Sequence, residues 1–145
     1  MDQFISTMGS KNNALLIDCR SCKSKEFLLS NPDVAILIIN SNVKHQLEGS
    51  EYSSRRAQCE QVAEILGKSL RDSSMTELDE KLTSIDKEAY RRARHVIGEI
   101  KRTVDASQAL KENEIVQLGI LMNQSHDSLR YIFLRFGKLM FLFNS

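Results

Sequence analysis

The sequence predicts an α+β fold, and three observations indicate it. The chain has 145 residues, which is enough for one domain with a hydrophobic core, because about two-thirds of the unfolded surface is buried at this size. Short apolar runs rich in β-branched residues occur in the first third, at 14–17 and 34–39. From residue 53 onward, apolar residues recur every three or four positions, which is the period of an amphipathic helix.

The two apolar runs are expected to be strands. The run 34–39 is nearly continuous, which is typical of a strand buried on both faces. Residues 26–29 are a weaker strand candidate. Residues 30–33 read Ser-Asn-Pro-Asp and contain the only proline, so they predict a turn, and we take this turn as the boundary between two lobes.

Four helices are expected after residue 53. The first ends at Gly67, and its inward side is expected to carry Ala57, Val62, Ile65 and Leu66. A short second helix lies near 75–82. Asp86 is the predicted N-cap of a long helix that runs to about residue 110, with an apolar side of Ala89, Tyr90, Ala93, Val96, Ile97, Ile100 and Val104. A fourth helix starts near residue 114, with an inward side of Ile115, Leu118, Leu121 and Met122.

Charge does not favour a nucleic-acid or membrane partner. Lys plus Arg number 20 against 19 for Asp plus Glu, so the molecule lacks a strong field for anionic polymers or surfaces. Acidic residues interleave with the basic residues of the long helix, which are Arg91, Arg92, Arg94, Lys101 and Arg102. We therefore expect a solvated or ion-paired helix surface. The apolar segment 131–143 is too short to span a bilayer, which takes about 20 residues.

The cysteines and histidines do not predict a metal site. Cys19 and Cys22 form one C-x-x-C pair, Cys59 stands alone, and no histidine lies at ligand spacing from another. We interpret the pair as surface-turn thiols in a reducing compartment. Residues 2–13 mix polar and apolar side chains, unlike a secretory signal, which favours a cytoplasmic location.

Seven stretches occur in an order and spacing that match one known family. They are MDQFIS with MG after it at 1–9, ALLIDCRS at 14–21, NSNVKH at 40–45, SEY at 50–52, RR and QCE at 55–60, YRRARHVIGEI at 90–100 and SHDSLR at 125–130. Over residues 1 to about 130, the chain resembles the galactokinases of the GHMP kinase superfamily. The resemblance implies a partial two-lobe α+β fold. Residues 1–32 would end the N-terminal lobe, 33–130 would begin the C-terminal lobe, and 131–145 would be a divergent apolar tail.

The resemblance also implies an activity and two site residues. Asp2 matches the family's catalytic aspartate, the base for attack of the C1 hydroxyl of α-D-galactose on the γ-phosphate of ATP. A carboxylate that orients or deprotonates the acceptor hydroxyl suits phosphoryl transfer. Tyr52 matches a tyrosine whose phenol, both donor and acceptor, contacts the sugar. The implied partners are galactose and ATP, with Mg²⁺ bound mostly through the nucleotide. The parent enzyme is expected to be a monomer.

Other parts of the family pattern are not matched in this chain. The sugar-clamping segment, the phosphate loop and the late glycine-rich segment have no counterpart, and no two of the six glycines lie within ten residues of each other. We therefore expect no nucleotide-binding residues in this chain, and expect it alone to be inactive and marginally stable. Two alternatives remain: a non-catalytic sugar sensor or regulator, and a related kinase for N-acetylgalactosamine.

Overall fold

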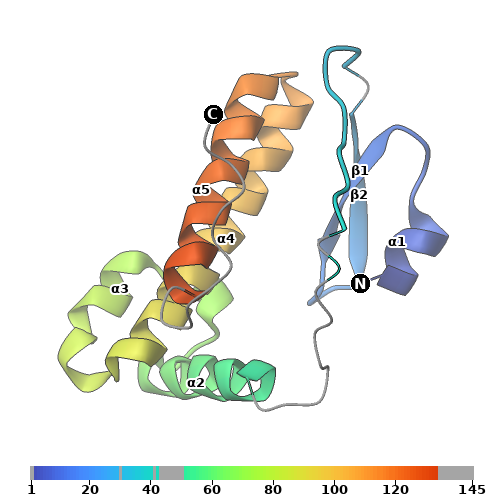
Figure 1. Cartoon of the computed structure of the whole chain (residues 1–145). Coiled ribbons are helices and arrows are strands. Elements are labelled where there is room, and N and C mark those ends of the chain that lie inside the picture. Colours follow the sequence, from blue (N-terminus) through green and yellow to red (C-terminus); the bar gives the residue numbers. More distant parts are fainter. Residues whose placement is uncertain (1, 30, 41, 43–50, 134–145) are drawn as a thin grey trace.

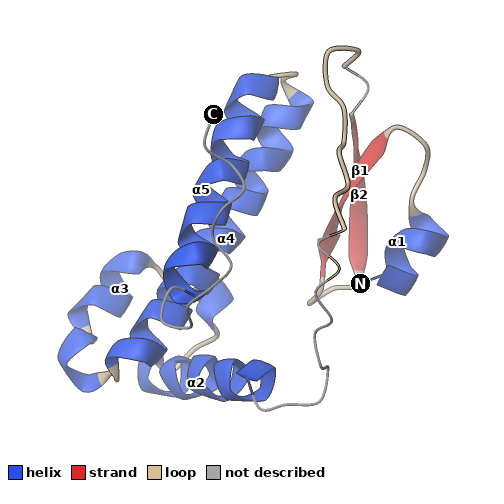
Figure 2. Cartoon of the chain, viewed as in Figure 1, coloured by secondary structure: helices blue, strands red, loops and turns tan. Residues whose placement is uncertain are grey.

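The computed structural model describes residues 2–29, 31–40, 42 and 51–133. Figure 1 shows an N-terminal part with a short helix, α1 (Asp2–Met8), and a hairpin, and a larger helical part in which two long helices pack against each other. Figure 2 shows that the strands are confined to the N-terminal part. This combination of a small sheet and helices confirms the α+β prediction.

The sheet is an antiparallel hairpin. β1 (Asn13–Asp18) pairs along its whole length with β2 (Lys23–Leu28), which begins earlier than the predicted strand at 26–29. The connecting turn holds Cys19 and Cys22, both exposed free thiols, as predicted for surface-turn cysteines. Phe27 is the only buried residue of the two strands, so the hairpin contributes little to the core.

The prediction of a strand at 34–39 is wrong. This segment has no regular secondary structure, and its side chains are exposed, by 59% for Ile39 and by 87% for Ile38. A strand takes its backbone hydrogen bonds from a neighbouring strand. The only sheet in the described residues is the hairpin, and 34–39 pairs with neither of its strands. The apolar pattern of 34–39 predicts that this segment is buried, but no described residues cover it.

The four predicted helices are confirmed. They are α2 (Glu51–Leu66), α3 (Met75–Glu80), α4 (Lys87–Lys111) and α5 (Ile115–Phe133), with single turns η1 (Leu70–Asp72) and η2 (Leu82–Ser84) on either side of α3. Gly67 ends α2 with a φ of 68°. Its N–H donates to Glu64 O at 3.0 Å, and the N–H of Lys68 donates to Ala63 O at 3.1 Å. This pair of bonds is a Schellman C-cap, for which glycine is preferred because it has no Cβ to strain.

Side-chain caps begin α3 and α4. The Asp86 carboxylate accepts from the N–H groups of Glu88 and Ala89 at 2.8 and 3.2 Å, which confirms the predicted N-cap. Ser74 and Glu77 form a reciprocal capping box at the start of α3. These caps satisfy backbone donors that would otherwise be unpaired at a helix start.

The core lies where α2, α3 and α4 meet. Val62 and Leu78 have no exposed surface, and they pack in one cluster with Leu70, Ile85, Ala89, Ala93 and Ile97. The helical period predicted these helices, but it did not predict correctly which side chains point inward. Ala57, Val104 and Met122 were expected on inward sides and are exposed. α5 packs along α4 and includes residues 131–133 of the predicted tail. Residues 134–145 lie outside the described part of the chain.

Candidate functional site

Asp2 lies in the first turn of α1, a helix with no buried residue. Its side chain is exposed, and its carboxylate makes no hydrogen bond or ion pair with any residue that the structure describes. The backbone carbonyl of Asp2 accepts from the Ser6 hydroxyl at 2.8 Å. Gly9 directly follows the end of α1, and an added Cβ there would lie 2.6 Å from the Ile5 carbonyl oxygen, so the exit from the helix requires glycine. The carboxylate is therefore accessible to solvent.

Tyr52 is the second residue of α2, and its side chain is 76% exposed. Its phenol lies close enough to Arg56 to raise that guanidinium's pKa, although the hydrogen bond from Arg56 to Glu60, at 2.8 Å, has the larger effect. Asp2 belongs to the N-terminal part and Tyr52 to the helical part (Figure 1). The structure records no contact between them, and neither residue lines the two cavities described below.

Two ion pairs join the hairpin turn to η1. Arg20 donates to both carboxylate oxygens of Asp72, at 3.0 and 2.7 Å, and Arg71 donates to Asp18. The Asp18 carboxylate also accepts from the Ser21 hydroxyl at 2.7 Å. These bonds, that from Arg71 above all, hold the pKa of Asp18 well below its usual range. Sequence reasoning missed this junction, because its partners are 52 and 53 residues apart.

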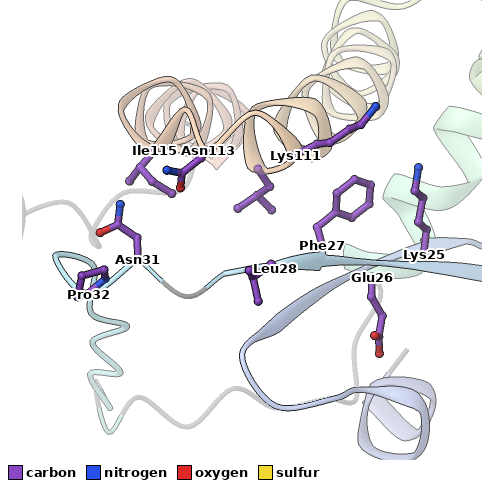
Figure 3. A pocket seen from close by; sticks show the side chains of 10 residues that line it. Lys25, Glu26, Phe27, Leu28, Asn31, Pro32, Lys111, Asn113 and Ile115 are labelled. Carbon is purple, nitrogen blue, oxygen red and sulfur yellow. The ribbon is translucent and has the colours of Figure 1, made fainter.

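The first cavity, of about 550 Å³, lies between the hairpin and the junction of α4 with α5. Figure 3 shows Phe27, Asn31 and Asn113 directed into this space, whereas Glu26 points away from it. Lys25 lies over the Phe27 ring, 5.2 Å from its centroid. Its lining residues come from both the N-terminal part and the helical part of the molecule.

The second cavity, of about 420 Å³, lies between α4 and α5. Its lining residues are Met75, Arg91, Arg94, His95, Arg102, Gln124, Asp127, Ser128, Tyr131 and Ile132. The two helices are joined here by a hydrogen bond between His95 Nδ1 and Ser128 Oγ, at 2.9 Å, and by one that the Ser125 hydroxyl donates to Glu99, at 2.5 Å. Burial lowers the pKa of His95. This cavity groups cations and polar donors, which composition alone could not predict.

The histidine and cysteine side chains of the described chain differ in burial. His95 is half-buried and bonded to Ser128, and His126 is exposed. Cys59 is half-buried in α2, and burial raises the pKa of its thiol. His45 lies outside the described residues. No group of three His, Cys, Asp or Glu side chains is placed to hold a metal ion in the part of the chain that the structure covers. Nor is any described helix both long and apolar enough to cross a bilayer.

Comparison of the sequence with known proteins gives close relatives. The chain is 54% identical over 131 residues to galactokinase of Homo sapiens, and 48% identical over 134 residues to galactokinase of Mannheimia succiniciproducens. Each match covers 90% of this chain but only 33 and 34% of the relative. The chain thus spans about a third of the length of these relatives. No protein-family model matches it.

Comparison of the fold agrees with the sequence. The chain superposes on the crystal structure of Lactococcus lactis galactokinase complexed with galactose with a TM-score of 0.80 and 30% identity, covering 88% of this chain and 34% of the other. By sequence and by fold, the chain therefore matches one segment, about a third, of each of these galactokinases. More narrowly, it is a galactokinase homologue over nine-tenths of its length, and the resemblance and the partial α+β fold that it implies are confirmed.

Proposed function

We propose that this chain carries the catalytic carboxylate and a sugar-contacting phenol of a galactokinase. The parent activity is ATP-dependent phosphorylation of α-D-galactose at its C1 hydroxyl. The observation that carries the proposal is the accessible, unpaired carboxylate of Asp2, within a sequence 54% identical to a galactokinase. The galactose bound in the L. lactis neighbour supports the choice of sugar.

Asp2 supplies only part of this chemistry. A carboxylate can accept the proton of the C1 hydroxyl and orient it for attack, while other groups bear the charge of the transferred phosphoryl group. Positioning and charge stabilisation supply most of the rate in phosphoryl transfer. The described residues offer neither a glycine-rich phosphate loop nor a metal cluster, so a Mg²⁺ ion accompanying ATP would take ligands from the nucleotide and from the rest of a kinase. We infer that the isolated chain is inactive.

A chimera tests the proposal. Residues 1–130 replace the matching segment of human galactokinase, and galactose-dependent release of ADP is measured. The chimera should be active, and Asp2→Ala should lower kcat by about 10²- to 10⁴-fold, because general base catalysis is worth that much. Asp33→Asn, which changes an exposed carboxylate in the turn after the hairpin, should leave kcat unchanged.

Tyr52→Phe distinguishes binding from chemistry in the same chimera. Removing only the phenolic O–H should raise KM for galactose about tenfold, with a smaller change in kcat, since one hydrogen bond to the sugar is lost. If the chimera is active and Asp2→Ala leaves its kcat unchanged, Asp2 is not the catalytic base. Binding of galactose without turnover favours the sensor, and preference for N-acetylgalactosamine favours the related kinase. Turnover by the isolated chain would refute its inferred inactivity.

A further inference from the structure

The second cavity has a charge pattern that the proposed function does not explain. Three cations of α4 are matched by acids of the same helix, and two of these pairs lie one turn apart: Arg92 donates to Glu88 at 2.5 Å and Lys101 to Asp105 at 2.6 Å. Arg102, which lines the cavity, pairs with Glu99. These contacts confirm the expected ion-paired surface for part of the basic face.

Arg91 and Arg94 are different. Neither pairs with a carboxylate in the described chain, and both line the cavity. They stand three residues apart on one face of α4, where like charges repel. Arg94 interacts with the Tyr90 hydroxyl, which is neutral at physiological pH. Asp127 is the one carboxylate of the lining, so the two guanidiniums leave an excess of positive charge facing the cavity.

The geometry of the lining suits an oxyanion. The Arg91 guanidinium lies over the Tyr131 ring at 5.2 Å from its centroid, a stacking that leaves the in-plane N–H donors available. The bond to Ser128 fixes the imidazole of His95, and Gln124 adds an amide donor. Guanidinium donors match the oxygens of a phosphate in pairs. Met75 and Ile132 add apolar surface to the lining.

We propose that the cavity between α4 and α5 binds a small phosphate monoester, with Arg91 and Arg94 donating to the phosphate oxygens. A volume of about 420 Å³ lies within the range of small-molecule sites, about 300 to 1,000 Å³. The apolar lining residues, Met75 and Ile132, would contact the carrier of the phosphate group. This site is separate from Asp2 and Tyr52, neither of which lines it.

Titration calorimetry of the full 145-residue chain with phenyl phosphate and with inorganic phosphate, at fixed ionic strength, tests the site. Phenyl phosphate should bind more tightly than inorganic phosphate, because its ring covers apolar surface. Arg94→Gln should weaken binding about tenfold, since it removes charged hydrogen bonds. Arg94→Lys should recover part of this loss. The matched control Lys101→Gln removes a charge from the same helix outside the cavity and should change Kd less than about twofold at physiological salt.

Several results would overturn the proposal. These are the absence of binding by either probe at millimolar concentration, equal effects of Arg94→Gln and Lys101→Gln, and binding that neither Arg91→Gln nor Arg94→Gln changes. Tighter binding of a polyglutamate peptide with the same arginine dependence would assign the surface to a protein partner instead. Arg94 is exposed, so its replacement should keep the helix content, which circular dichroism verifies for each variant.

Discussion

Replacing Leu78 by alanine tests the helical core. Leu78 has no exposed surface and packs in the cluster that contains Val62 and Ile85. The change removes three carbon atoms, each worth about 0.8 kcal/mol of transfer free energy, or about 2.4 kcal/mol together. The cavity left behind adds to this cost, because neighbouring side chains relax only in part. We expect the free energy of unfolding to fall by about 3 to 4 kcal/mol.

The assay is urea unfolding of both proteins, followed by circular dichroism. Leu82→Ala is the matched control, because Leu82 lies four residues later in η2 and is 50% exposed. The control should cost less than about 1 kcal/mol, the usual range for partly exposed positions. Equal losses for the two variants, or a loss below about 1 kcal/mol for Leu78→Ala, would refute the assignment of the core.

Two further predictions concern local chemistry. Gly67→Ala should lower the free energy of unfolding by about 1 kcal/mol, because alanine is strained at a φ of 68°, whereas Gly119→Ala, inside α5 with no atom within 4 Å of the added Cβ, should raise it by a similar amount. Thermal melts of the pair should shift in opposite directions, and shifts of the same sign would contradict the cap. The hydrogen bond from Lys68, followed by those from Ser74, lowers the pKa of Glu77 to about 2 from an ordinary 4.5. Because this folded-state pKa is lowered, the stabilisation is fully present above pH 4.5 and is lost as the pH falls toward 2. Melting temperatures should therefore fall more steeply with decreasing pH for the wild type than for Glu77→Gln. The same pH dependence in both proteins would show that the Glu77 carboxylate does not contribute this stabilisation.

Local signals allowed much of the helical part to be predicted. The Asp86 cap and the helix end at Gly67 depend on hydrogen bonds between residues two to five positions apart. Both partners therefore lie within a short stretch of sequence, and the pattern can be recognised there. The facing of side chains depends also on which helices meet. Ala57 and Val104 fit the apolar period, but both are exposed, because none of the described helices packs over them.

Longer-range features could not be predicted in this way. A strand at 34–39 needs a partner strand, and the residues of the segment do not show whether such a partner exists. The pairing of Arg20 with Asp72 joins residues 52 positions apart. Asp2 and Tyr52 were found through the family resemblance, because an exposed acid or phenol at a helix start has the same local pattern as an ordinary cap or surface residue.

The junction between the hairpin and the helices is mostly ionic. One buried aromatic ring, Phe27, accompanies two ion pairs whose side chains remain 35 to 54% exposed. Charges that face water are screened over about 3 Å in molar salt, against about 8 Å in physiological salt. Asp2 belongs to the part before this junction and Tyr52 to the part after it, so we expect added salt to loosen the connection between the two residues proposed to act on the sugar.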